Sequence, residues 1–124
     1  MNLNQVTIPV LDVARSVSFY EKLGLQLIVK SLPGYARFQC PQGASTFSLH
    51  LVEELPQGGG AWIYFEENNL DEHKAVLVEK GFVFEELSED KPWLWREARL
   101  KDPDNNQIII YFAGNNRINP PWRI

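Results

Sequence analysis

Hydrophobic and polar residues alternate over several short stretches of the chain, as they do in strands with one buried face. In residues 5–10 every even position is apolar, and in residues 45–52 Phe47, Leu49 and Leu51 keep the same two-residue period. Together these patterns and the turn residues between them predict eight strands. The other six fall at residues 25–29, 35–40, 61–66, 82–86, 93–101 and 107–112.

Two stretches have the wider apolar spacing of amphipathic helices. In the first, Val13, Val17 and Tyr20 share one stripe, Asp12 is placed as an N-cap, and Gly24 is placed as the C-terminal stop. The second covers residues 70–80, with Asn68 or Asn69 as its cap. The chain therefore combines two helices with eight strands, which predicts the α+β class.

The predicted elements occur twice in the same order. Residues 5–27 and 62–84 both read strand, helix, glycine, strand, at an offset of 57 residues. A long period that occurs only twice indicates two copies of one supersecondary module. We expect two tandem βαβββ modules, at about 1–55 and 61–113, within a single domain of residues 1–124. The glycine-rich residues 56–60 are interpreted as a hinge between the modules.

The tail, residues 114–124, is too rich in proline for a helix. Three apolar residues in it predict that it docks on a surface: Ile118, Trp122 and Ile124. Either it folds back onto its own chain, or Trp122 is an anchor at an interface with a second copy.

Composition excludes several classes of function. The net charge is -4 and the pI is about 5.1, which disfavours a nucleic-acid partner. Cys40 is the only cysteine, so no disulfide forms within the chain. No apolar run is long enough to span a membrane, and the N-terminus does not resemble a signal peptide. We therefore expect a soluble, cytoplasmic domain with no membrane partner.

Two segments carry a family resemblance: IPVLDVARSVSFYEKLGL near the start and LKDPDNNQIIIYF near the end. They resemble the vicinal oxygen chelate superfamily, which includes glyoxalase I, fosfomycin-resistance proteins, ring-cleaving dioxygenases and bleomycin-resistance proteins. The resemblance implies that the two modules form a half-open eight-stranded barrel with the helices outside. It also implies a homodimer, in which a second copy covers the exposed edge and cavity.

Metal-dependent members of this superfamily place one ligand on each of four strands. Carried over to this chain, those positions are Gln5, His50, Trp62 and Ile109. Only His50 is a strong ligand for a divalent metal, and Trp62 and Ile109 supply no donor. Because a metal needs three or four protein donors, the sequence predicts neither a metal site nor a cofactor.

Strand alternation also predicts a face directed away from the helices, with aromatic walls and a few polar groups. Its members are Gln5, Thr7, Ser48, His50, Trp62, Tyr64, Glu66, Ile109 and Tyr111, with Arg37 from the third strand. Trp95, Glu97 and Arg99 join it unless a bulge reverses the seventh strand. This composition suits a small-molecule pocket, and the alternative is a face that is solvated or covered by a partner subunit. The orientation of Arg37 and Arg99 decides between anionic and cationic ligands.

Three functions remain open. One is a metal-free protein, similar to the bleomycin-resistance branch, that sequesters a planar or cationic compound between aromatic walls. Glu66 then either holds a cation or is an ordinary carboxylate at a strand end. Another is a glyoxalase-like lyase, isomerase or dioxygenase acting on a small oxygenated metabolite. In that case His50 is the candidate general base, with Glu97 or Glu66. The last is a structural or regulatory subunit without a ligand.

Overall fold

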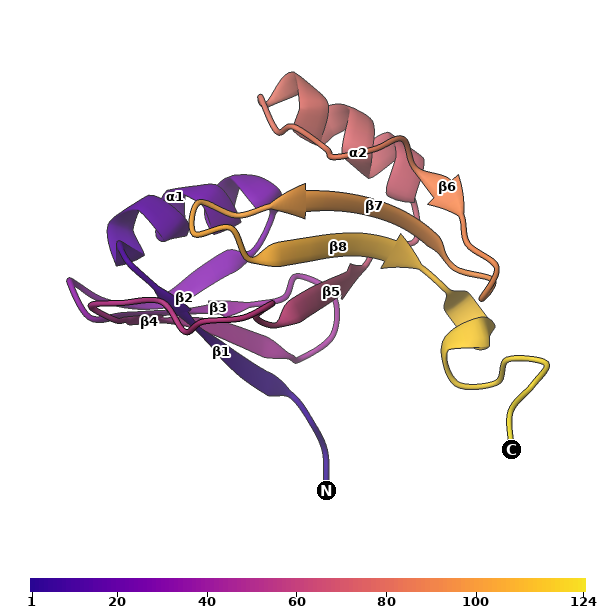
Figure 1. Ribbon diagram of the computed structural model, residues 1–124, viewed down its shortest axis with the longest axis horizontal. Coiled ribbons are helices and arrows are strands. Elements are labelled where there is room, and N and C mark those ends of the chain that lie inside the picture. Colours follow the sequence, from indigo (N-terminus) through magenta and orange to yellow (C-terminus); the bar gives the residue numbers. More distant parts are fainter. The chain divides into compact units, whose positions relative to one another are not determined.

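The computed structural model describes all residues, 1–124, and divides into two compact units (Figure 1). Unit 1 comprises Met1–Ala61 with Asp102–Asp104, and unit 2 comprises Trp62–Lys101 with Asn105–Ile124. Each unit has one α-helix and one four-stranded mixed sheet, and the two sheets are not joined into a closed barrel. The predicted α+β class and the pair of βαβββ modules are confirmed.

Unit 1 contains a sheet with the strand order β1-β4-β3-β2, in which β1 and β4 are parallel and the other neighbours antiparallel. Helix α1 contacts β2, β3 and β4, and its buried Tyr20 lies against Phe38 and Phe47 of the sheet. The elements of this unit are β1 (Gln5–Val10), α1 (Val13–Leu23), β2 (Gln26–Ser31), β3 (Tyr35–Gln39) and β4 (Thr46–Leu51).

Helix α1 begins and ends at the residues that the sequence predicts. The Asp12 side chain accepts a hydrogen bond from the backbone N–H of Arg15 at 3.0 Å. At the other end Gly24 has a φ of 119°, and its N–H is bonded to the carbonyls of Tyr20 and Glu21. A positive φ favours glycine, which has no Cβ.

We expect Gly24→Ala to lower the free energy of unfolding by about 1–2 kcal/mol, because an L side chain is strained at this φ. Gly34→Ala is the matched control, since Gly34 has no positive φ and open space around it. Urea denaturation of both variants measures the difference. Equal stability of the two variants would contradict the assigned role of Gly24.

Residues Asp102–Asp104 belong to unit 1 and form a turn bound to α1. The buried Tyr20 hydroxyl donates to Asp102 Oδ2 at 2.6 Å. The Asp104 carboxylate is fully buried and accepts from Leu11 N at 3.2 Å, Arg15 Nη2 at 2.7 Å and Ser16 Oγ at 3.3 Å. These bonds give the Asp-Pro-Asp sequence a structural role, as a buried carboxylate needs such partners.

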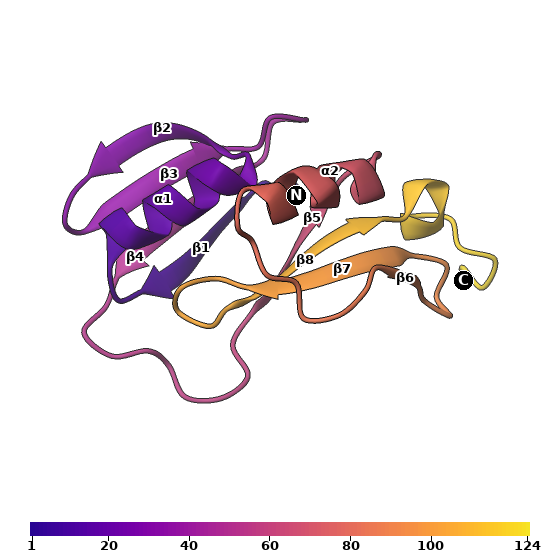
Figure 2. The same cartoon turned by 90° about the horizontal axis from the view of Figure 1, so that it is seen from above.

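Unit 2 repeats this architecture with the strand order β5-β8-β7-β6. Strands β5 and β8 are parallel, and α2 contacts β7 and β8 (Figure 2). Its elements are β5 (Trp62–Glu66), α2 (Leu70–Glu79), β6 (Glu89–Asp90), β7 (Arg96–Lys101), β8 (Gln107–Phe112) and the short 3-10 helix η1 (Gly114–Arg117).

The predicted strand at residues 82–86 is wrong. Phe82 and Phe84 are half-buried and Val83 is 83% exposed, so the alternation is real. Its backbone, however, makes no strand ladder: Glu85 N donates to Arg99 O of β7, and Phe82 N donates to Leu77 O of α2. The edge strand of this sheet forms later, at β6. Strand β7 also starts at residue 96 rather than 93, because a turn with a positive φ of 66° at Leu94 precedes it.

The C-terminal tail differs from its prediction in two respects. It contains η1, stabilised at its start by Glu66, where no helix was expected. Its apolar side chains, Ile118, Trp122 and Ile124, are exposed and do not dock on the chain itself. An interface with a second copy through Trp122 remains a prediction. Neither α-helix, at 11 and 10 residues, has the length and apolar content needed to cross a membrane.

Candidate functional site

In unit 1 the strand register confirms that alternate residues lie on the sheet face opposite α1. Ser48 is paired with Thr7 on β1 and with Arg37 on β3, and Tyr35 is paired with His50. We call this surface the polar face of unit 1. Its side chains on the three paired strands are Gln5, Thr7, Pro9, Tyr35, Arg37, Gln39, Thr46, Ser48 and His50.

A hydrogen-bonded chain of side chains crosses this face. Gln5 Nε2 donates to Ser48 Oγ at 2.7 Å, and Ser48 Oγ lies 2.8 Å from the Tyr35 hydroxyl. Arg37 Nε donates to the same hydroxyl at 2.9 Å, and Thr46 is bonded to the Gln5 amide. Four sheet positions from three strands are thus fixed relative to Ser48, which is fully buried.

The metal ligands implied by the resemblance do not fit a metal site. Gln5 is paired with Thr46, whereas His50 is paired with Pro9, four residues farther along the two strands. At about 3.3 Å per residue this separates Gln5 from His50 by roughly 13 Å, too far to share one ion. The other two positions, Trp62 and Ile109, carry no donor atom suited to a metal. No group of three or more His, Cys, Asp or Glu side chains comes together in the structure.

In unit 2 the corresponding face carries a cluster of aromatic rings. The rings of Trp95 and Tyr111 stack with centroids 4.8 Å apart, and Tyr64 meets both edge-on, at 5.9 and 5.5 Å. Ile109 and Tyr111 belong to one cluster of buried residues, and Trp95 packs against this cluster. Tyr64 is 39% exposed and Trp62, on the same strand face, is 53% exposed. Trp62, Tyr64, Trp95 and Tyr111 are referred to as the aromatic surface.

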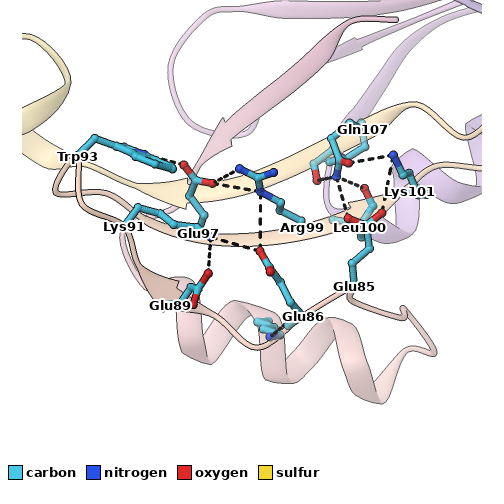
Figure 3. Close-up of polar contacts among 12 residues, drawn as sticks. Glu85, Glu86, Glu89, Lys91, Trp93, Glu97, Arg99, Leu100, Lys101 and Gln107 are labelled. Atoms are coloured by element: carbon cyan, nitrogen blue, oxygen red, sulfur yellow. Dashed lines mark hydrogen bonds and ion pairs between the residues drawn. The ribbon is translucent and has the colours of Figure 1, made fainter. Parts of the chain in front are cut away.

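At one edge of the aromatic surface, the buried Glu97 forms an ion pair with the half-buried Arg99; Figure 3 shows this pair. Glu97 is 1% exposed, and its Oε2 accepts from Arg99 Nη2 at 3.0 Å while its Oε1 accepts from Trp93 Nε1 at 2.9 Å. The Arg99 guanidinium lies 5.1 Å from the Trp62 ring centre. The hydrogen bond to Glu97 raises the pKa of Arg99 further above its ordinary range, so this guanidinium stays charged.

The register of β7 resolves the orientation left open by the sequence. Glu97 is paired with Tyr111 and Arg99 with Ile109, so both lie on the face of the aromatic surface and no bulge reverses them. The same face continues to Gln107, whose Nε2 donates to Leu100 O at 3.2 Å and to Glu85 Oε2 at 3.3 Å (Figure 3). Gln107 is therefore bonded to other residues of the protein, and these bonds stabilise the start of β8.

Glu66 has partners within unit 2. Its Oε1 accepts from the backbone N–H groups of Ala113 at 3.2 Å and Gly114 at 3.0 Å, and its Oε2 lies 3.6 Å from Arg117 Nε. These contacts hold the start of η1 beside β5. Of the two interpretations of Glu66, the structural carboxylate is the one that the geometry favours.

The tyrosines of the two faces differ in acidity. Burial, and next the charge of Glu97, raises the pKa of Tyr64, and burial with Glu66 raises that of Tyr111. For Tyr35 desolvation is the largest single effect and acts upward, but the hydrogen bonds with Ser48 and Arg37 and the Arg37 charge together outweigh it and lower the pKa. The sequence reasoning missed Tyr35, although it stands two residues before Arg37 and so has the same strand parity. Trp93 was also missed: the sequence placed it at the start of a predicted strand, 93–101, whereas it lies in the turn before β7.

Comparisons with known proteins agree with this architecture. The family described as Glyoxalase/Bleomycin resistance protein/Dioxygenase superfamily matches residues 2–110. The probable trivalent organoarsenical cleaving enzyme of Bacillus subtilis (strain 168) is 26% identical over 127 residues, which cover 94% of this chain and 83% of that protein.

Solved structures show the same fold. A superfamily member from Sphaerobacter thermophilus DSM 20745 has a TM-score of 0.74 at 25% identity, covering 90% of this chain and 97% of that one. TioX from Micromonospora sp. ML1 has a TM-score of 0.71 at 18% identity, covering 91% and 99%. With its two βαβββ modules and a family match over most of its length, the chain belongs to the glyoxalase/bleomycin resistance protein/dioxygenase superfamily.

Proposed function

We propose that this protein binds a planar small molecule on the aromatic surface of unit 2, without a metal ion. The observation that carries the proposal is the exposure of Trp62 and Tyr64 beside an ion pair whose carboxylate, Glu97, is buried. Exposed rings with ordered neighbours offer a stacking platform at little entropic cost. The mixed aromatic and polar lining matches that of small-molecule sites.

The charged side chains around the aromatic surface are already paired with one another, so the shape of a ligand should matter more for binding than its charge. Glu97 neutralises Arg99 directly, and Glu86 lies 3.9 Å from the same guanidinium. Glu66 is bonded to backbone N–H groups and Arg117. With these carboxylates already paired, stacking area rather than a cationic group is the feature that a ligand must supply.

The name of the Bacillus subtilis relative describes cleavage of a trivalent organoarsenical. The function proposed for this chain does not include that activity. A soft centre such as trivalent arsenic favours thiolate donors. This chain has one cysteine, Cys40, and burial raises the pKa of its thiol, which disfavours the thiolate. His50, the candidate general base, is exposed, and no hydrogen bond in the structure orients it.

Trp62→Ala should weaken the binding of a planar dye by about tenfold, because stacking on one aromatic ring contributes roughly 1–3 kcal/mol. Quenching of tryptophan fluorescence by proflavine, a planar cation, and by anthraquinone-2-sulfonate, a planar anion, measures the affinities. We expect both dyes to bind wild type within a few-fold of one another, and chelation with EDTA to leave binding unchanged.

Trp122→Ala is the matched control, because Trp122 is exposed to a similar extent, 56%, but lies in the tail. It should bind both dyes as wild type does. Absence of saturable binding, or an equal loss in the two tryptophan variants, would refute the aromatic surface as the site. Loss of binding on chelation would refute the metal-free part of the proposal.

A further inference from the structure

The polar face of unit 1 has an unusual charge composition for this protein. The chain has 16 acidic residues, yet none lies on this face of β1, β3 or β4. On β2, the residues paired with Arg37 and Tyr35 are Val29 and Ser31. The ionisable groups of the face are therefore Arg37, His50 and the Tyr35 phenol. In an acidic protein, such a surface is locally favourable for an anion.

Arg37 is held in position without being neutralised. Its Nε donates to the Tyr35 hydroxyl at 2.9 Å, and its guanidinium lies 5.5 Å from the Tyr35 ring centre. No carboxylate lies within ion-pair distance of it, in contrast to Arg15, Arg96, Arg99 and Arg117. A guanidinium has five N–H donors, so four remain for another group.

The hydrogen-bond chain also leaves the Tyr35 proton available. Ser48 Oγ accepts from Gln5 Nε2 and is fully buried, so its own proton is satisfied by donation to Tyr35. Either hydroxyl can be the donor between Ser48 and Tyr35; with Ser48 as the donor, the Tyr35 oxygen accepts from both Ser48 and Arg37, which leaves its own O–H for another acceptor. A phenol that accepts two such bonds has a lowered pKa and is a stronger donor.

We propose that Arg37 and Tyr35 together bind an anionic oxygen group, a carboxylate or a phosphate, on the polar face of unit 1. The guanidinium fork matches the two oxygens of either group, and the phenol supplies a further donor from two residues away on the same strand. All of these residues belong to unit 1, whereas the aromatic surface belongs to unit 2. The anion is either a free metabolite or one end of a larger ligand.

Nuclear magnetic resonance titration of the full chain tests this proposal. Inorganic phosphate and benzoate are added separately at constant ionic strength, while the Arg37 Nε–H signal is followed. We expect a saturable shift with at least one anion, and the anion that binds more tightly identifies the class. Arg37→Gln should weaken binding at least tenfold, as judged from backbone amides of β3 and β4, and Tyr35→Phe should weaken it several-fold.

Lys30→Gln is the matched control, because it removes the same charge from β2 at an adjacent register position, paired with Ala36. It should bind as wild type does. Equal weakening in the Lys30 and Arg37 variants would show non-specific attraction and overturn the site, as would an unsaturable shift. If a second copy covers this face, neither anion moves the Arg37 signal and Arg37→Gln changes the sedimentation coefficient, which also overturns it. Trp62→Ala should leave anion binding intact, so this test and the dye test fail independently.

Discussion

Replacing Asp104 with alanine should lower the free energy of unfolding by about 2–4 kcal/mol. The substitution leaves the Leu11 N–H and the Ser16 hydroxyl without the acceptor that they share in the folded state. Arg15 contributes less to the loss, because its side chain is 47% exposed and water replaces its partner. Denaturation in guanidinium chloride, followed by circular dichroism, measures the change.

Asp71→Ala provides the comparison for a carboxylate in an exposed ion pair. Asp71 accepts from Arg96 Nε at 3.0 Å but is 65% exposed, so its removal should cost less than about 1 kcal/mol. A cost for Asp104→Ala no larger than that for Asp71→Ala would mean that the Asp-Pro-Asp turn does not stabilise unit 1.

Raising the pH above about 10 should destabilise the protein by about 1.4 kcal/mol per pH unit through Tyr20 alone. Burial, and next the Asp102 charge, raises the pKa of Tyr20 well above its ordinary value of 10.0. Above pH 10 the unfolded phenol has lost its proton and the folded phenol keeps it, so the folded state binds one proton more. The stabilising contribution is complete below pH 10 and is lost as the pH rises toward the folded pKa.

Tyr20→Phe tests this because phenylalanine has no proton to lose. The variant should be less stable at pH 7, since Asp102 loses a hydrogen bond of 2.6 Å, but its stability should fall less steeply above pH 10. Urea denaturation at several pH values from 8 to 11.5 gives both slopes. Parallel slopes for the variant and wild type would show that Tyr20 ionises equally in the folded and unfolded states.

The fold was predictable because its signals are local and repeated. Asp12 and Gly24 mark the ends of α1 by their own backbone chemistry, and the second module repeats the same order. The strand at residues 82–86 was mispredicted because alternating apolar residues show only that one side of the segment is buried. A ladder needs a partner strand, and the sequence of this segment does not reveal which residues face β7.

The sequence predicted which residues share a sheet face, but not which residues are paired with one another across neighbouring strands. Alternation grouped Ser48 with Gln5 and Thr7, but it left the orientation of Arg37 and Arg99 open until the register of β3 and β7 was known. It did not give the register between strands, and for that reason the four-residue offset of His50 from Gln5 emerged only from the structure. Tyr35 was missed because its importance comes from hydrogen bonds with Ser48 and Arg37, and no single-residue signal reports those bonds.

The ion pair of Glu97 and Arg99 has a consequence for how fast a ligand is gained and lost. Because Arg99 is already bonded to Glu97 and seated on Trp62, this edge of the aromatic surface is ordered before any ligand arrives. The binding proposed there would therefore require little loss of side-chain freedom at this edge. Association should then be similar for many flat compounds, and the lifetime of each complex, set by its stacked area, will distinguish one compound from another.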